Sequence, residues 1–315
     1  MDCGRWKLRM TFVKQPDAGG DTMTLLKVDN SLYPPFSADV INGLTSLEIR
    51  EDDIIICAYP KAGTHWVWEI SRCLLAGTTT LPLVEKDNNM IECVPSATLD
   101  ALPSPRILNT HLTFDQLPAE IRQKRCQIIY INRNPKDLAV SCYHHHRKLT
   151  DFYQYEGSWE NFLPLFMDGK LDYGSWFAYV TDWERVVREN PGLPIHVMAY
   201  EDLKQDPVQQ IAGLGKFLGQ EVSEQFATSV ADKCSFVNMK SRKGQFETGS
   251  DGEPIMYRKG EVGDWTNWFT VLQNEAMDGY LRQHLAESSL KFKYTLGSDL
   301  MGVNDRDVII DANMN

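Results

Sequence analysis

No stretch of the sequence is apolar for long enough to cross a lipid bilayer, which takes about 20 consecutive residues. The N-terminal segment contains basic side chains but no apolar block behind them, so the pattern does not predict a signal peptide. We therefore expect neither membrane insertion nor secretion, and we expect the protein to reside in the cytoplasm.

Positive charge is scarce as well. The chain carries 32 lysines and arginines against 43 aspartates and glutamates, which gives a formal net charge of −11. An electrostatic hold on DNA or RNA needs a net or strongly clustered positive charge, so we expect no nucleic-acid partner. Binding of an anionic small ligand remains possible if local positive groups outweigh the negative electrostatic field of the whole protein.

Cysteine pairs with the spacing of a metal or disulfide framework are absent. The seven cysteines are odd in number and include no C-x-x-C pair, so we expect reduced thiols. The three consecutive histidines at 144–146 do not suggest a metal site either, because neighbouring helix positions point about 100° apart. We expect no metal.

Neither an internal repeat nor a linker divides the 315 residues. Short β-type runs alternate with helical patterns, which predicts an α/β fold with a mostly parallel sheet in a single three-layer domain. We expect an N-terminal extension at 1–28, the domain at 29–296 and a C-terminal tail at 297–315. The expected strands are 54–58, 106–110, 127–131 and 195–200, and helices are expected after 64, after 135, at 159–168, at 175–189, after 206 and from 270 to about 285.

The segment 59–66, Tyr-Pro-Lys-Ala-Gly-Thr-His-Trp, joins an expected buried strand to a helix N-terminus. Successive backbone N–H groups at such a turn make a nest for phosphate or sulfate, and the helix dipole favours negative charge. Lys61 adds a cation and Thr64 a hydroxyl. The lysine precedes the glycine, unlike the G-x-x-x-x-G-K-[ST] loop of nucleoside triphosphatases. The alternative interpretation is a tight turn with a solvated lysine.

Two further segments contain cations that suit an anion. Arg133 follows a buried strand and Ser141 lies two turns into the next helix. Ligands of open α/β sheets gather at the carboxyl ends of strands, and the arginine fork matches phosphate. The segment 258–260, Arg-Lys-Gly, puts two cations beside an unobstructed N–H. Taken alone, Arg133 would pair with Asp137 or a carbonyl, and 258–260 would be a solvated turn.

Together and in this order, the three segments resemble the cytosolic sulfotransferase family, which transfers a sulfuryl group from 3′-phosphoadenosine 5′-phosphosulfate to hydroxyl or amine acceptors. The matching motifs are PKAGTHW, RNPKDLAVSCY and RKGEVGDW, with a smaller match at 200–203. The resemblance covers nearly the whole chain. It implies a P-loop-like strand–loop–helix, the phosphosulfate as cosubstrate with 3′,5′-bisphosphoadenosine as product, a small-molecule acceptor and no metal.

The resemblance also implies a role for each matching position. Lys61 would neutralise the leaving group, with Ser141 beside it in the catalytic set. His111 would take the acceptor proton as the base, although alone it would be interpreted as satisfying a strand-end carbonyl. The implied nucleotide contacts are Lys61, Ala62, Gly63, Thr64, His65, Trp66, Arg133, Ser141, Tyr200, Cys234, Ser235, Phe236, Arg258, Lys259 and Gly260.

The sequence departs from the family pattern at several positions. Asn109 stands where the family usually has a lysine that is thought to stabilise the transferring group, so we expect slower transfer or a reshaped acceptor site. His145 stands at an aromatic position of the phenol pocket, which predicts a more polar pocket. Asn109, His111 and His145 are the expected acceptor contacts, within loops 29–37, 80–100, 143–153 and 240–257. A homodimer through 266–275 is expected with weaker support, because Thr266 replaces a lysine.

Three other functions remain open at this stage. A nucleoside-phosphate kinase of related fold would require magnesium and ATP, and the order of residues in the lysine loop argues against it. A family member that only binds the bisphosphate nucleotide is favoured by Asn109 but not by the intact Lys61 and His111. A member that sulfates an alcohol and then eliminates the sulfate would act as a dehydratase.

Overall fold

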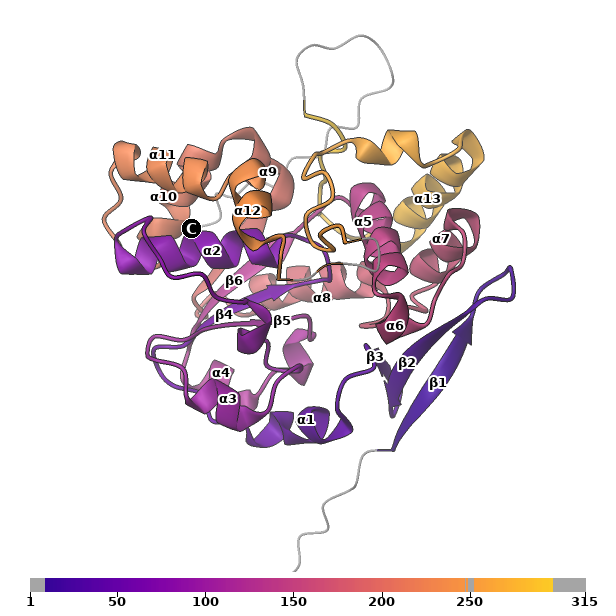
Figure 1. Ribbon diagram of the computed structural model, residues 1–315, viewed down its shortest axis with the longest axis horizontal. Coiled ribbons are helices and arrows are strands. Elements are labelled where there is room, and N and C mark those ends of the chain that lie inside the picture. The colour runs from indigo at the N-terminus through magenta and orange to yellow at the C-terminus, as the bar shows by residue number, and fades with distance from the viewer. Residues whose placement is uncertain (1–8, 247, 249–251, 297–315) are drawn as a thin grey trace, which may run out of the picture.

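A parallel sheet of four strands forms the centre of this computed structural model, which describes residues 9–246, 248 and 252–296 (Figure 1). The strands lie in the order β5-β4-β6-β7, and all neighbours are parallel. Every residue of β4 is buried, as expected for a parallel strand covered on both faces. The α/β class and the expected strands are confirmed, with the bounds β4 Ile54–Ala58, β5 Ile107–Thr110, β6 Gln127–Asn132 and β7 Ile195–Ala199.

Helices cover both faces of this sheet. α2 contacts β4 and β5 and packs against α10, whereas α8 lies behind β6, where Trp183 stacks on Tyr130 at 4.7 Å (Figure 1). This confirms the predicted three layers. The helices are α1 Ala38–Gly43, α2 Thr64–Ala76, α3 Ser96–Asp100, α4 Ala119–Gln123, α5 Pro135–Lys148, α6 Thr150–Tyr153, α7 Trp159–Met167, α8 Trp176–Glu189, α9 Tyr200–Gln205, α10 Pro207–Phe217, α11 Glu224–Lys233, α12 Phe236–Lys243 and α13 Val271–His284, with 3-10 turns η1 Leu44–Ser46, η2 Asp87–Asn89, η3 Phe114–Gln116 and η4 Asp264–Asn267.

Local sequence signals set the ends of several helices. The side chain of Asn134 accepts a hydrogen bond from the backbone N–H of Asp137, and Pro135 fills the first turn of α5. Thr270 and Gln273 form the predicted capping box of α13. Gly77 ends α2 with a φ of 63°, a conformation that glycine adopts without a Cβ penalty.

Within the described residues, the segment that we expected to be an N-terminal extension contains β-strands. β1 Met10–Pro16, β2 Thr22–Val28 and β3 Ser31–Tyr33 form an antiparallel sheet, and β2 buries Leu25 completely. Met23, Leu25, Leu26 and Val28 of β2 are buried, while Lys27 is exposed, so this strand packs its apolar side chains on the core. The predicted tail at 297–315 lies outside the described residues.

Within the described residues, no helix is long and apolar enough to cross a membrane. The six cysteines of this part of the chain are unbonded thiols, and all but Cys93 are buried.

Candidate functional site

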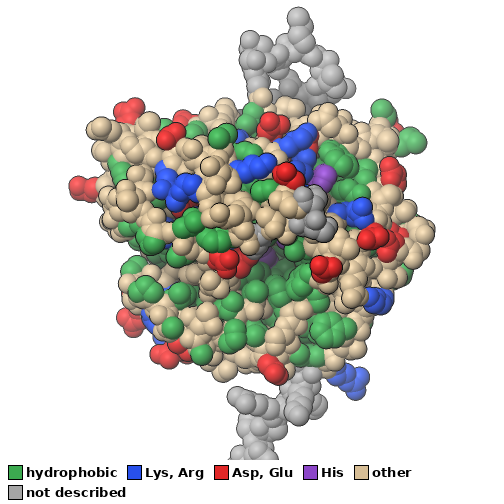
Figure 2. Space-filling view, viewed as in Figure 1, with side chains coloured by type: hydrophobic (Ala, Val, Ile, Leu, Met, Phe, Trp, Pro, Cys, Tyr) green, Lys and Arg blue, Asp and Glu red, His purple; other side chains and the backbone are tan. Residues whose placement is uncertain are grey.

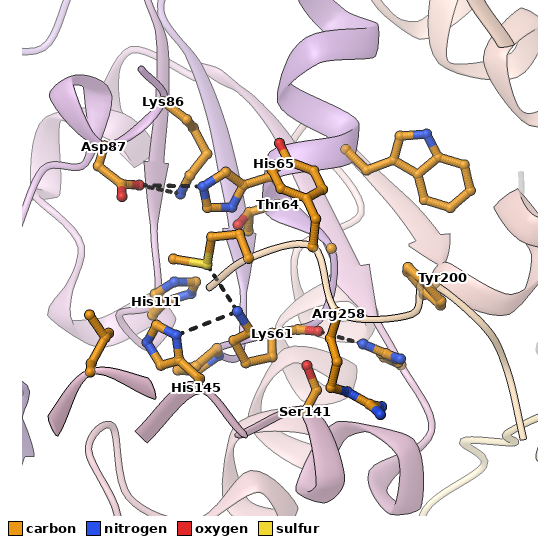
Figure 3. A pocket seen from close by; sticks show the side chains of 18 of the residues that line it. Lys61, Thr64, His65, Lys86, Asp87, His111, Ser141, His145, Tyr200 and Arg258 are labelled. Carbon is orange, nitrogen blue, oxygen red and sulfur yellow. Dashed lines mark hydrogen bonds and ion pairs between the residues drawn. The ribbon is translucent and has the colours of Figure 1, made fainter. Parts of the chain in front are cut away.

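The carboxyl ends of β4, β5 and β6 open into a cavity of about 450 Å³. The chain leaves β4 toward β5 on one side and reaches β6 on the other, so this edge of the sheet is a topological switch point, where open α/β sheets bind ligands. Lys61 follows β4, His111 follows β5 and Arg133 follows β6. Figure 3 shows that residues of all these segments surround one space.

This cavity brings most of the predicted site residues together. Three of them do not line it: Ala62 is buried in the turn, Asn109 is buried in β5, and Ser235 caps α12 by accepting from the backbone N–H of Asn238 at 3.4 Å. The predicted residues that line the cavity are Lys61, Gly63, Thr64, His65, Trp66, His111, Arg133, Ser141, His145, Tyr200, Cys234, Phe236, Arg258, Lys259 and Gly260.

The loop between β4 and α2 forms one wall of the cavity. Gly63, at the N-cap of α2, has a φ of 116°, and an added Cβ would lie 3.0 Å from the Tyr200 ring. Lys61 adopts a left-handed φ of 68°, which is strained for a residue with a Cβ, and Arg133 donates to its carbonyl at 2.9 Å. The loop therefore aims the positive end of the α2 dipole at the cavity.

The ammonium of Lys61 lies inside the cavity. Its Nζ is 3.0 Å from Met256 Sδ and 3.5 Å from His145 Nδ1 (Figure 3). Burial, and then the charge of Lys61, lower the pKa of His145 well below its usual value. His145 is therefore neutral at physiological pH and presents Nδ1 to the ammonium as an acceptor.

His111 is held as a neutral imidazole with a defined tautomer. Its Nδ1 lies 2.7 Å from the carbonyl oxygen of Ala58, which can only accept, so Nδ1 carries the proton and Nε2 has a lone pair. Burial first, and the charge of Lys86 second, lower the pKa of His111 to about 4. This arrangement suits a general base at neutral pH.

Glu92, which no motif singled out, holds the backbone of His111 in place. One carboxylate oxygen accepts from the His111 backbone N–H at 2.7 Å and from the Tyr173 hydroxyl at 3.3 Å. Burial raises the pKa of Glu92 to about 6.

Two more cations, Arg258 and Lys259, line the cavity. Arg258 pairs with Asp264 at 2.6 Å, and Lys259 bonds the same carboxylate. Burial raises the pKa of Asp264, but hydrogen bonds from Lys259, Asn267 and Arg258 outweigh it and bring the pKa to about 2. An anion in the cavity would compete with Asp264 for these two cations.

Aromatic side chains border the space between the α2 loop and these two cations. Trp66 packs edge-on against Tyr200 at 5.5 Å, and the Arg133 guanidinium lies 4.2 Å from the Tyr200 ring centre. Gly260 has a φ of 67°, and a Cβ there would come 2.2 Å from the ring of Phe236. The loop can therefore approach Phe236 only because residue 260 is glycine.

The expected loops 29–37, 80–100, 143–153 and 240–257 all contribute to the other end of the cavity. Apolar side chains dominate there, and Figure 2 shows such side chains gathered around a hollow in this face. His145, Lys86 and Asp87 add polar groups, and the latter two were not predicted because no motif marks them. The apolar contributors are Pro34, Phe36, Met90, Leu149, Phe152, Tyr153, Tyr173 and Met256.

No group of three or more potential ligands among the described residues is arranged to hold a metal ion. The three consecutive histidines of α5 occupy different surroundings. His146 bonds Asp172 at 2.7 Å, His145 lines the cavity, and His144 packs on Trp268 at 4.6 Å.

Known proteins resemble this chain in sequence and in fold. A family model described as "Sulfotransferase domain" matches residues 51–289. Human sulfotransferase 6B1 is 35% identical over 263 residues, which cover 82% of this chain and 85% of that protein. Rat sulfotransferase 1A1 is 33% identical over 283 residues, which cover 83% and 94%.

Solved structures give the same result. The mouse sulfotransferase SULT7A1, crystallised in complex with PAP, matches with a TM-score of 0.71 and 32% identity, over 84% of this chain and 96% of that one. Retinol dehydratase in a complex with retinol and PAP matches with a TM-score of 0.73, over 91% and 100%. Its identity of 18% supports a shared fold and nothing further.

Proposed function

Because the chain belongs to the sulfotransferase family, we propose that it transfers a sulfuryl group from 3′-phosphoadenosine 5′-phosphosulfate to a hydroxyl or amine of a small-molecule acceptor. The observation that carries the proposal is the placement of a neutral His111 and the ammonium of Lys61 in one cavity. Family membership, together with the order of the lysine loop, sets the kinase alternative aside.

The residues present fit a nucleotide with anionic groups at two separated points. Arg133 Nε is buried and has no hydrogen-bond partner in the described part of the chain, so it is ready to serve a ligand. Trp66 and Phe236 offer ring faces for a base, and Gly260 leaves room beside Phe236. We assign the 3′-phosphate to Arg133, Ser141 and 258–260, and the 5′-phosphosulfate to 61–65.

When bound, the phosphosulfate supplies a sulfuryl group whose sulfur–oxygen bond to the 5′-phosphate breaks as a bond to the acceptor forms, the electron pair leaving with the phosphate. His111 Nε2 accepts the proton of the acceptor hydroxyl. Lys61 places a positive charge where the leaving oxygen gains charge, and the N-terminus of α2 adds its dipole. The Ala58 carbonyl orients the His111 ring, and Glu92 holds the backbone of His111.

We further propose that the acceptor is a largely apolar molecule that carries a polar group in addition to the hydroxyl or amine that is sulfated, which a simple phenol lacks. Pro34, Phe36 and Phe152 offer apolar contacts, while His145 supplies ring nitrogens close to Lys61. A cytoplasmic location and a homodimer through 266–275 also remain proposals. Val271 and Leu272, at the start of α13, are 75% and 77% exposed and would become covered in such a dimer.

We expect 3′,5′-bisphosphoadenosine to raise the melting temperature more than 5′-ADP, 2′,5′-bisphosphoadenosine or Mg-ATP at equal concentration. A ligand that binds only the folded state stabilises it by RT ln(1 + [L]/Kd), so differential scanning fluorimetry ranks the affinities. Arg258→Ala should abolish the advantage over 5′-ADP, because it removes a cation assigned to the 3′-phosphate. A larger shift with Mg-ATP would favour the kinase function over sulfuryl transfer. No shift with any of the nucleotides would contradict nucleotide binding.

The pH dependence of kcat/KM should lack a step near the ordinary pKa of histidine. A base must be neutral, and His111 with a pKa of about 4 stays neutral down to that pH. Activity should therefore be level from pH 8 to about 5 and fall only below that. A fall centred near pH 6 that vanishes in Glu92→Gln would contradict the level profile and assign the step to Glu92, whereas a fall near 6.5 in both proteins would contradict the assigned base.

A further inference from the structure

A buried lysine that no motif singled out lies on the cavity wall. Lys86 is 4% exposed, and lysine is almost never this buried unless its charge has a partner. It directly precedes η2 and lines the same cavity as Lys61 and His111. Figure 3 shows its amine beside the His65 ring, away from Ser141 and Arg258.

Asn109 fixes the position of this lysine. Lys86 Nζ donates to Asn109 Oδ1 at 2.7 Å, and Asn109 Nδ2 donates back to the Lys86 carbonyl at 3.3 Å. The chain beyond Lys86 runs along the edge of β5, where the Ile91 N–H donates to the Asn109 carbonyl at 3.1 Å and the Asn89 amide donates to the Ile107 carbonyl at 3.0 Å. These contacts fix both the backbone around residue 86 and the end of its side chain, so the amine has a defined position in the cavity wall.

The charge of Lys86 is only partly compensated. Among the described residues its ion-pair partner is Asp87, at 3.1 Å, whose side chain is 32% exposed and thus partly screened by water. Burial, and next the charge of Lys86, lower the pKa of the neighbouring His65 well below its usual value. The ammonium has three N–H donors, and Asn109 and Asp87 take two of them. One donor is left for a ligand in the cavity.

We propose that Lys86 is a catalytic cation of this site, donating to an oxygen of the transferring sulfuryl group. The inference rests on the proposed function. The resemblance leads us to expect a lysine at position 109, and the structure supplies an ammonium at that residue from a different segment. In this inference Asn109 does not remove a positive charge from the site, because its side chain binds the ammonium of Lys86. Lys61 then serves the leaving oxygen and Lys86 the sulfuryl oxygens, while the acceptor proton goes to His111.

Two neutral variants separate charge from structure. Lys86→Gln keeps a donor toward Asn109 and hence the fold, whereas Lys86→Met removes both donor and charge. We expect kcat to fall about 10²-fold in each, the usual effect of losing one preorganised donor to developing charge. The thermal shift with 3′,5′-bisphosphoadenosine should be unchanged, because that nucleotide lacks the sulfuryl group. Lys27→Met, at an exposed lysine of β2, is the matched control and should keep the wild-type kcat.

A spectroscopic readout in the ligand-free protein accompanies the kinetics. The pKa of His111, followed by NMR of its ring, should rise in Lys86→Gln because a positive charge beside it is gone. The other charged groups near the ring, Lys61, Asp87, Glu92 and Asp172, are unchanged in this variant. In the double variant Lys86→Gln/Asn109→Lys, an ammonium returns from β5, and we expect kcat to recover at least tenfold over Lys86→Gln, about 1.4 kcal/mol.

The outcomes distinguish this inference from the proposed function. If the wild type transfers sulfuryl groups and Lys86→Gln keeps its kcat within about threefold, well short of the expected loss, the inference is wrong and the proposed function stands. If Lys86→Met does not fold, Lys86→Gln decides alone. If the wild type neither transfers sulfuryl groups nor responds to 3′,5′-bisphosphoadenosine, the proposed function itself fails.

Discussion

His111→Ala abolishes sulfuryl transfer to hydroxyl acceptors while 3′,5′-bisphosphoadenosine still raises the melting temperature; this is the largest effect that we expect. The variant loses the only group that we assign to remove the acceptor proton, and general base catalysis contributes about 10²- to 10⁴-fold. Initial-rate assays at pH 7, with the thermal shift measured on the same preparations, test this expectation.

The nucleotide response should survive because His111 lies at the end of β5, while the assigned 3′-phosphate residues come from α5 and the segment 258–260. His196→Ala provides the matched control, since His196 lies in β7 against Phe217 and does not line the cavity. Full activity in His111→Ala, or loss of both activity and nucleotide response, would overturn the assigned role.

Lys61→Ala lowers turnover by at least about 10²-fold, as expected for removal of a preorganised charge from a developing oxyanion. The ammonium lies inside the cavity 3.5 Å from His145 Nδ1, where few water molecules would screen it. kcat should fall more than KM rises, because the charge on the leaving oxygen develops only during transfer.

The backbone makes Lys61→Ala a clean test. Residue 61 has a φ of 68°, and lysine and alanine both carry a Cβ, so the strain is the same in both proteins. Lys216→Ala, at an exposed lysine of α10, controls for the loss of one positive charge from the chain. Turnover in Lys61→Ala within about threefold of the wild type, far short of the expected loss, would sink the proposed role of the lysine.

Much of the fold was predictable because its signals are local. The apolar run at 54–58 and the apolar positions at 127–131 predict buried strands, and Asn134 with Pro135 predicts the start of α5. The β1–β2 hairpin was missed. Among the described residues β1 pairs with β2 alone, and it keeps much of its surface in water, so its sequence is as polar as that of an extension.

The sequence by itself determined the α/β class and the loop at 59–66 between a buried strand and a helix N-terminus, because each depends on residues that are neighbours along the chain. Only the tertiary structure decided that Lys86 reaches Asn109, 23 positions away, and that Glu92 supports His111, 19 positions away. Neither pair has a periodic or capping signal, since side chains so distant in sequence meet through the path of an irregular segment along the edge of β5. That path depends on the packing of the whole domain, and it sets both the contact of Glu92 with the His111 backbone and the charge near the base.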